Sequence, residues 1–398
     1  MNTPRLSPLT LCLAGVFCTL HVQAQTTPPP PSSSVTVYGV IDIGLVHQNH
    51  PDSGIPVLVG TFLATQTLTG PFAAGAGYGS ALGGNGLESS SGLNVAQGAR
   101  SRLGIKATET LSSEWTARIE LEHRFSPDTG GIHGKEAVFW DKALIGLTSS
   151  NWGDLSLGRD YMPAFYPQYV LDPWLNEGVA QMGANLYAFA GYLNEISRFS
   201  RYNNGVHYKM KFGGFTGMLG MSMKEDTGSG LLKNYSNRRG FSAMYSQGPW
   251  FLGLGYDRSE VLAAGANEEM WFAGVSFDAG FIKPRLSHTR ALVKAVGPDF
   301  GVLASPTLGM GKSELHPSSW TLSATAPAGP SGVFKFGMTR LSWDDGSALR
   351  AETKQSKYSL GYEHTLSKRT AIYTDVTQGK TAQLPTLKAW DLGIRHKF

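Results

Sequence analysis

AWDLGIRHKF, residues Ala389–Phe398, closes the chain and decides its fold. The apolar positions of this stretch alternate along it and are Trp390, Leu392, Ile394 and Phe398. The charged positions between them are Asp391, Arg395 and Lys397. Successive side chains of a strand point to opposite faces, so this stretch has one apolar and one polar face. In an exported chain, such a strand ending on an aromatic residue is typical of a transmembrane β-barrel.

The N-terminus has the features of a secretory signal. Arg5 lies in a short polar start, residues 9–20 form a compact apolar run, and residues 22–24 offer small side chains for cleavage. A membrane anchor is the alternative, but the apolar run is too short to cross a bilayer as a helix. We therefore predict a signal peptide over residues 1–24, a Pro/Ser-rich lead-in over 25–34, and a barrel over 35–398.

Composition narrows the class of protein. Both cysteines, Cys12 and Cys18, fall within the predicted signal, so no disulfide is expected in the mature chain. Outside the signal, no stretch reaches the ~18–20 apolar residues that a transmembrane helix needs. The chain has 49 glycines, only 16% charged residues and no clear linker, which favours one large barrel over several domains.

Charge and motifs exclude several functions. Without Arg5 the balance is 33 Lys+Arg against 30 Asp+Glu, about +3, which is too weak a basic excess for a nucleic-acid partner. Residues 75–79, GAGYG, lack the Lys-Ser/Thr ending of a phosphate loop. The histidines are scattered without a metal-ligand spacing, and no serine stands in a nucleophile motif. We expect no cofactor, no metal and no enzymatic activity.

About sixteen strand-like runs follow one another, most of them close to ten residues long. They are residues 35–46, 99–110, 114–125, 138–149, 152–158, 201–213, 215–224, 238–247, 250–259, 268–278, 281–290, 317–326, 332–343, 355–366, 370–379 and 389–398. Tight turns alternate with long connections, of which the longest are residues 47–98, 160–200 and 291–316. Short turns on one side and long loops on the other are the usual layout of outer-membrane barrels.

The charged residues of these runs share one face. In residues 114–125 the apolar positions are Trp115, Ala117, Ile119 and Leu121, and they alternate with Arg118, Glu120, Glu122 and Arg124. In residues 201–213, Tyr202, Val206, Tyr208, Met210 and Phe212 are expected to oppose Arg201, His207, Lys209 and Lys211. A charge on the lipid face costs roughly 2–4 kcal/mol at the midplane, so the charged faces must look into a wet lumen. A water-soluble β-sandwich also alternates, but the export signal and the terminal aromatic argue against it.

Several motifs, in order along nearly the whole mature chain, resemble the trimeric general porins of Gram-negative bacteria, the β-proteobacterial type in particular. They are residues 34–45 (SVTVYGVIDIGL), 101–109 (SRLGIKATE), 157–163 (LGRDYMP), 212–215 (FGGF), 366–371 (LSKRTA) and the terminal 395–398. The resemblance implies a sixteen-stranded antiparallel barrel, a homotrimer, and a third external loop folded inward to narrow each pore.

The resemblance also implies basic wall residues that face acidic residues of that loop. Arg102 matches a wall arginine in the SRLG motif, and Arg201 matches another. Where the family usually has a further arginine, this chain has Asp141 beside Lys142, which puts the strength of any anion preference in question. The first long loop, residues 47–98, is also longer than is usual.

We therefore predict a pore constriction with two sides. The wall candidates are Arg100, Arg102, Arg118, Arg124 and Arg201, and the loop candidates are Asp160, Asp172, Glu177 and Glu195. A pore selects by diameter, wall charge and the groups that replace lost hydration, so opposed charges here would set the selectivity. For any single residue, the alternative is that its charge merely solvates the wall. Trp390 and Phe398 are expected to serve membrane contact or assembly.

The loop over residues 160–200 is also rich in aromatic residues. They are Tyr161, Phe165, Tyr166, Tyr169, Trp174, Tyr187, Phe189 and Tyr192. They either pack the loop against the wall or form a stacking track for sugars or aromatic solutes. The sequence thus predicts an outer-membrane porin for passive diffusion of small hydrophilic solutes with a modest anion preference. The alternatives are a channel selective for a sugar, a carboxylate or an aromatic solute, and a barrel adhesin acting through its long first loop.

Overall fold

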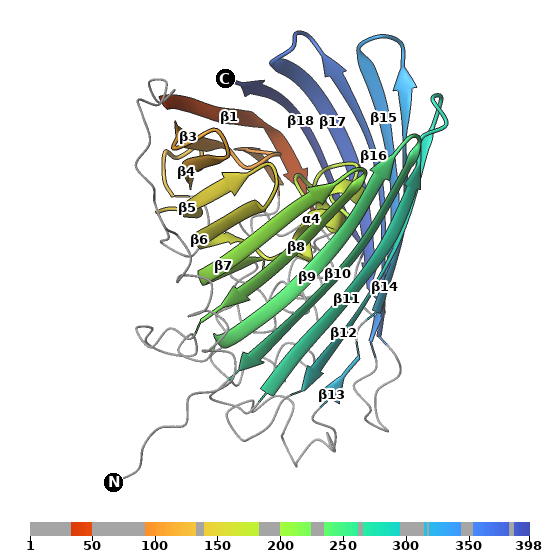
Figure 1. Cartoon of the computed structure of the whole chain (residues 1–398). Coiled ribbons are helices and arrows are strands. Elements are labelled where there is room, and N and C mark those ends of the chain that lie inside the picture. The colour runs from red at the N-terminus through yellow and green to blue at the C-terminus, as the bar shows by residue number, and fades with distance from the viewer. Residues whose placement is uncertain are drawn as a thin grey trace.

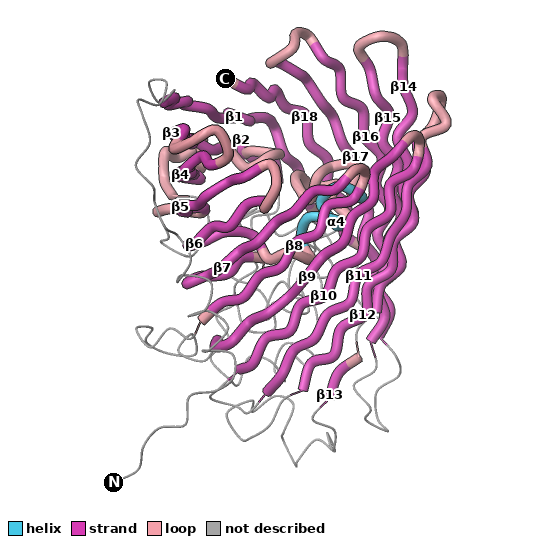
Figure 2. Tube along the Cα trace, viewed as in Figure 1, coloured by secondary structure: helices cyan, strands magenta, loops and turns pink. Residues whose placement is uncertain are grey.

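The structure is a computed structural model, and it describes residues 33–49, 92–132, 139–182, 200–223, 235–261, 266–294, 314–316, 318–343, 353–381 and 386–398. Almost all of this part of the chain is strand, with one short helix, α4 (Phe165–Leu171) (Figure 2). No helix of the described residues has the length and apolarity that crossing a membrane would require.

The strands form one antiparallel sheet that curves into a barrel (Figure 1). Their bounds are β1 (Ser33–Gln48), β2 (Gly92–Ala96), β3 (Arg102–Thr110), β4 (Trp115–Arg124), β5 (Lys142–Ser149), β6 (Gly153–Tyr161), β7 (Arg201–Phe212), β8 (Phe215–Ser222), β9 (Tyr235–Gln247), β10 (Trp250–Val261), β11 (Ala266–Phe277), β12 (Lys283–Lys294), β13 (Glu314–Leu315), β14 (Ser318–Ala328), β15 (Gly332–Trp343), β16 (Thr353–Thr365), β17 (Thr370–Thr381) and β18 (Leu387–Lys397).

Within the described ranges the barrel wall has sixteen strand positions. Both β2 and β3 pair with β1, and both β13 and β14 pair with β12, so each of these two couples fills a single position. The first strand closes the sheet on the last, with Ile43 opposite Ile394. Among the described residues, each of the sixteen positions has a hydrogen-bonded neighbour on both sides, as a wall in lipid requires because nothing there can satisfy free backbone groups. The predicted sixteen-stranded antiparallel barrel is confirmed.

Side chains alternate between an apolar outer face and a polar inner face. On β18, Leu392 is 51% exposed on the outer face, whereas the neighbouring Asp391 is fully buried on the inner one. The outer face is exposed in the isolated chain because lipid, and not protein, covers it. This is the alternation that the C-terminal stretch predicts.

The prediction that Tyr202 shares the apolar face of its strand is wrong. The pairing of β6 with β7 shifts register between Gly158 and Asp160, and Asn204 adopts a positive φ of 47°. This bulge adds one residue to β7, so the alternation changes face there. Tyr202 is therefore buried and donates a hydrogen bond to the Asp257 carboxylate.

Connections between strands alternate in length as expected, but several boundaries move. Strand β1 begins at Ser33, inside the predicted lead-in, and β12 extends to Lys294, inside the predicted third long connection. Residues 92–96 of the predicted first loop form β2. The predicted signal peptide lies outside the described residues.

The segment that follows β6, residues 162–182, runs along the polar face of the strands and includes α4. We call it the α4 segment. Its helix packs against β9–β12. Glycines of these strands make room for it: a Cβ at Gly255 would lie 3.0 Å from the Ala164 Cα, and one at Gly274 would overlap the Leu171 Cδ1. At these two positions, glycine lets the helix lie directly on the strand backbones.

Candidate functional site

The polar faces of β3–β6 carry a lattice of opposite charges. Arg118 is bonded to Asp154 by two guanidinium–carboxylate hydrogen bonds of 2.6 and 2.5 Å. The Lys142 ammonium lies 3.4 Å from a Glu120 oxygen and 3.3 Å from an Asp160 oxygen. These pairs come from different strands that the barrel register brings side by side, so the wall is charged but largely compensated.

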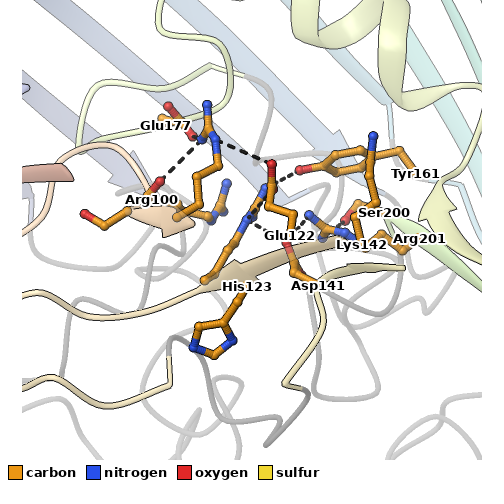
Figure 3. Close-up of polar contacts among 12 residues, drawn as sticks. Arg100, Glu122, His123, Asp141, Lys142, Tyr161, Glu177, Ser200 and Arg201 are labelled. Atoms are coloured by element: carbon orange, nitrogen blue, oxygen red, sulfur yellow. Dashed lines mark hydrogen bonds and ion pairs between the residues drawn. The ribbon is translucent and has the colours of Figure 1, made fainter. Parts of the chain in front are cut away.

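Asp141 joins two of the predicted wall arginines. Its Oδ2 atom lies 2.5 Å from Arg124 Nε and 2.5 Å from Arg201 Nη2 (Figure 3). Arg201 is only 3% exposed, and its guanidinium also lies 4.0 Å from the centre of the Tyr161 ring. We call this group of Arg124, Asp141 and Arg201 the Asp141 cluster. Its arginines have little surface left for direct contact with a solute.

The two arginines of the Asp141 cluster keep its carboxyl group ionised. Burial alone would raise the pKa of the Asp141 carboxyl, but the guanidinium groups of Arg124 and Arg201 outweigh it and lower the pKa to about 2. Asp141 therefore stays ionised across the physiological range. The cluster itself has one carboxylate and two guanidinium groups, and Glu122, 3.6 Å from the Arg124 Nε atom, offsets part of its remaining positive charge.

The α4 segment approaches the wall beside this cluster. The Arg102 Nη1 atom lies 3.3 Å from the Glu177 Oε1 atom, and the Arg102 Nε atom lies 3.6 Å from Glu122. Arg100 donates from Nη1 to the backbone carbonyl of Asn176 at 3.2 Å. Of the predicted acids that the structure describes, Glu177 is the one that contacts a predicted wall arginine. Its contact with Arg102 joins residues 75 positions apart in the chain.

The other predicted acids lie elsewhere. Asp160 was expected in the loop but lies in β6, where it is part of the wall lattice. Asp172 follows α4, and its carboxylate accepts the backbone N–H groups of Trp174, Asn176 and Met182 at 2.8–3.1 Å. It shapes the α4 segment instead of facing the arginines. Glu195 lies outside the described residues. Arg118 contacts Asp154 and Glu120 of the wall, not an acid of the α4 segment.

Away from Arg102, hydrogen bonds hold the α4 segment to β16 and β17. The sequence analysis did not predict this role for the residues that form them. The buried Lys357 ammonium donates to the backbone carbonyls of Val179 at 2.9 Å and Gln181 at 2.7 Å. The Trp174 Nε1–H group donates to the Asp375 carboxylate at 2.7 Å. The only sequence signal was an inward-facing lysine and aspartate on neighbouring strands. Their partners are groups of the α4 segment, far away in the chain.

The terminal aromatic residues take two different positions. Trp390 lies on the outer face of β18 and stacks on His47, with ring centres 5.9 Å apart. Phe398 exchanges backbone hydrogen bonds with Gly39 of β1, which helps to hold the chain end in the closed wall. In both cases the side chain is partly exposed outside the barrel wall.

The arrangement as a whole provides opposed charges and no reacting centre among the described residues. A positive wall segment around Arg100, Arg102 and the Asp141 cluster faces the Glu177 carboxylate of the α4 segment. Opposed charges of this kind create an electric field around them. The field acts on passing ions and dipoles without a chemical reaction.

Comparison with known proteins agrees with this structure. A family model described as Gram-negative porin matches residues 10–383. Outer membrane porin protein 32 of Delftia acidovorans is 25% identical over 388 residues, which covers 95% of this chain and 91% of that protein. An outer membrane porin protein of Bordetella pertussis is 29% identical over 336 residues, with 75% of this chain and 82% of that protein covered.

Solved structures share the fold. The anion-selective porin from Comamonas acidovorans has a TM-score of 0.69 at 21% identity, covering 92% of this chain and 100% of that one. The trimer form of OmpT from Vibrio cholerae has a TM-score of 0.62 at 11% identity, covering 92% and 99%. Because the family model spans nearly the whole of a chain that closes into the same kind of barrel, this chain belongs to the Gram-negative porin family of the outer membrane.

Proposed function

We propose that this porin forms a water-filled channel for the passive diffusion of small hydrophilic solutes, with a modest preference for anions. The observation that carries the proposal is the contact between Arg102 of the wall and Glu177 of the α4 segment. It sets a cationic wall against an acidic segment on the polar face of the barrel. Solutes would move down their own gradients, and the opposed charges would sort them by sign and dipole.

In this proposal the α4 segment is the inward-folded third external loop, and it narrows the pore. Its contacts support this role, since the helix packs on β9–β12 and Trp174 and residues 179–181 are held by β16 and β17. The segment thus covers the polar face on one side of the barrel. The remaining passage would run alongside the Arg102–Glu177 contact, past the polar faces of β3 and β4.

The anion preference is modest because most wall cations already have a carboxylate partner. Arg118 is compensated by Asp154, and Asp141 is shared by Arg124 and Arg201. Arg102, with 23% of its side chain exposed, is left as the main cation for passing ions, although Glu177 and Glu122 offset part of its charge. The likeness in fold to an anion-selective porin supports the sign of this preference.

Replacing Arg102 with Ser should shift the reversal potential in a salt gradient toward cations. The variant removes a cation beside Glu177 and leaves that carboxylate unbalanced, so the anion-to-cation permeability ratio should fall about two- to fivefold. Planar-bilayer recording of single channels gives both the conductance and the ratio. Arg369→Ser, in the exposed turn between β16 and β17, is the matched control. An unchanged ratio for Arg102→Ser would remove Arg102 from the constriction.

We further propose that three chains assemble into a homotrimer, as one solved relative in fold does. The barrel has a complete wall of its own, so each protomer would carry a separate channel. Light scattering of the folded protein in detergent should give a protein mass of three chains, and bilayer records should show conductance steps in threes. A mass of one chain, with single steps only, would contradict the assembly.

The contacts of Tyr161, Phe165 and Trp174 do not favour a stacking track for sugars. Tyr161 stacks on Phe165 with ring centres 4.0 Å apart and is also contacted by the Arg201 guanidinium. Trp174 is buried against β16 and β17. These rings pack the α4 segment, which supports the general channel over a sugar-selective one. Tyr187, Phe189 and Tyr192 lie outside the described residues. So does most of the long first loop, through which the alternative, a barrel adhesin, would act.

A further inference from the structure

The inner face of the wall carries a second group of cations, on the strands β12, β14 and β15, which follow one another in the sheet (Figure 1). The group mixes basic and hydroxyl side chains, namely Lys283, Arg285, Ser323, Thr325 and Lys335. Their inward direction follows from the strand alternation, because the residues next to them, Leu286, Leu322 and Phe334, are exposed on the outer face. We call these five residues the lumen basic cluster.

The strand register brings the cluster together in two rows. Arg285 pairs with Ser323 in one row, and Lys283 pairs with Thr325, which pairs with Lys335, in the next. With strands ~4.8 Å apart and a rise of ~3.4 Å per residue, the three cations start from backbones roughly 7–12 Å apart. Arg285 is turned toward the second row, since its Nη1 atom donates to Thr325 Oγ1 at 3.1 Å and to the Lys283 carbonyl at 3.1 Å.

Several donors of the cluster are not used by the protein itself. The Arg285 Nε atom and the Ser323 Oγ atom are buried and have no hydrogen-bond partner among the described residues. Ser323 is only 4% exposed. Within the same ranges, no group accepts a hydrogen bond from Arg285 Nη2. Buried polar groups are nearly always paired, so unused donors beside one another indicate a place where an acceptor can bind.

Arg285 also lacks a carboxylate partner. It forms no ion pair within the described part of the chain, and Asp172 and Asp278 act on its charge only from a distance. The Asp172 carboxylate accepts three backbone N–H groups of the α4 segment, which already compensate part of its charge. Arg285 therefore differs from Arg118 and Arg124 of the opposite wall, which are both paired with aspartates.

The two lysines of the cluster are only partly compensated. Lys335 lies 2.8 Å from Glu363, but the same Glu363 oxygen lies 3.5 Å from Arg395, so one carboxylate serves two cations. Lys283 lies 3.9 Å from Asp278, whose side chain is 51% exposed in the turn, where water weakens such pairs. The cluster is thus a local excess of positive charge on the polar face of the barrel.

The cluster lies directly beside the α4 segment, toward the short turn between β11 and β12. The segment covers Gly337, where a Cβ would lie 2.5 Å from the Met182 sulfur, and Lys335 is two residues further along β15. On β12, Ser287 lines a small cavity beneath α4, and Arg285 is two residues further. A solute that has passed the α4 segment would therefore meet these cations next.

We propose that the lumen basic cluster binds a phosphate group, carried by inorganic phosphate or by a small phosphate monoester. The inference deepens the proposed function and rests on it, because the ligand would reach the cluster through the channel. Arg285 supplies a forked pair of donors, the lysines supply point charges, and Ser323 and Thr325 supply hydroxyl groups. Guanidinium and ammonium groups in this combination suit the oxygens of a phosphate group.

The convergence of the cluster favours phosphate over other anions. A phosphate group places about two negative charges and several acceptor oxygens on one centre, so donors from three strands can reach it together. A dicarboxylate separates its two charges along a chain, and fewer of these donors would reach each end. Chloride carries one charge and makes less use of the directed hydroxyl and guanidinium donors.

The test measures block of the chloride current through single channels of the full-length folded protein. Inorganic phosphate, glycerol phosphate and succinate are added in turn, in about 0.1 M potassium chloride, where charges are screened over ~10 Å. A pH of about 8 keeps the phosphate probes doubly charged. Arg285→Gln removes the central cation. Arg290→Gln is the matched control, because it removes the same charge from the outer face of the same strand.

We expect saturable block of the natural chain by phosphate, with a half-blocking concentration about tenfold higher in Arg285→Gln and unchanged in Arg290→Gln. Block by glycerol phosphate as well would assign the site to any phosphate group, whereas block by inorganic phosphate alone would assign it to the free ion. Lys283→Gln, a second variant at a more exposed position, should weaken the block about threefold. Absence of block in the natural chain, equal weakening in Arg290→Gln, or equally strong block by succinate would overturn the proposal.

Failure of this site can be told apart from failure of the proposed channel. Conductance in chloride alone shows that a channel has formed and that each variant is folded. If the channel conducts but phosphate does not block it, the site fails and the channel proposal stands. If no variant conducts, calorimetric titration of the protein in detergent with inorganic phosphate tests the site by itself, and equal affinity of the natural chain and Arg285→Gln would overturn it.

Discussion

Asp141→Asn should make the channel clearly more selective for anions. The amide cannot balance the two guanidinium groups of Arg124 and Arg201, which lie 2.5 Å from the carboxylate in the natural chain. The wall beside the passage therefore gains a full positive charge. A unit charge at about 4 Å is worth ~1 kcal/mol in water, so the anion-to-cation permeability ratio should rise about two- to fivefold.

The pH dependence of this effect follows from the pKa of Asp141. With a pKa of about 2, the carboxyl is ionised at both pH 7 and pH 4, so the difference between the variant and the natural chain should be the same at both values. It should diminish only as the pH falls through about 2. The contribution of ionised Asp141 to folding stability depends on pH in the same way. It is fully present above the ordinary pKa of Asp and is lost as the pH falls toward 2.

Two controls separate this role from a general change in charge. Asp278→Asn removes the same charge in the exposed turn between β11 and β12 and should leave the permeability ratio unchanged. Adding Arg201→Met to Asp141→Asn should return the ratio toward that of the natural chain, because the extra positive charge is gone. If Asp278→Asn raises the ratio as much as Asp141→Asn, net charge and not the Asp141 cluster controls selectivity.

Lys357→Met should release one side of the α4 segment and enlarge the channel. The Lys357 ammonium is fully buried and donates to two backbone carbonyls, Val179 and Gln181. Methionine fills a similar volume but donates nothing. A hydrogen bond from a charged donor contributes about 1.5–3 kcal/mol, so the loss of two should favour open or disordered positions of the segment. We expect single-channel conductance to rise about 1.5-fold, with added current noise.

Lys368→Met, in the exposed turn between β16 and β17, is the control for Lys357→Met because it removes the same charge far from the α4 segment. Trp174→Phe offers an independent second variant: it keeps an aromatic ring but removes the hydrogen bond to Asp375, and should also raise current noise. Normal folding of each variant can be checked by its heat-resistant migration in detergent gels. Conductance that is unchanged in both Lys357→Met and Trp174→Phe would show that these contacts do not hold the constriction.

Much of the wall could be predicted from the sequence because its information is local. The alternation of Trp390, Leu392 and Ile394 with charged residues depends only on the two-residue period of a strand and on lipid at the outer face. The same rule failed at Tyr202, where a bulge at Asn204 inserts one residue and changes the face. A bulge depends on how two strands pair, and the spacing of apolar residues in β7 alone does not predict it.

The candidate constriction could be predicted only in part. Arg102 and Glu177 were both among the predicted constriction residues, and the structure brings them into contact. That they line a pore constriction stays a prediction. The assignment of Asp160 to the loop was wrong, because β6 extends to Tyr161 and takes this residue into the wall. Asp172 was assigned to the pore but accepts backbone N–H groups of its own segment.

The sequence by itself determined the closed barrel, its polar interior and its apolar exterior, because each of these follows from side-chain order within single strands. Only the tertiary structure decided which charged side chains remain available to passing ions. Asp141 meets Arg201 across 60 residues of chain, and Lys357 meets Val179 across 178. Electrostatic strength depends on separations of a few ångströms, and these are set by strand register and by the path of the α4 segment.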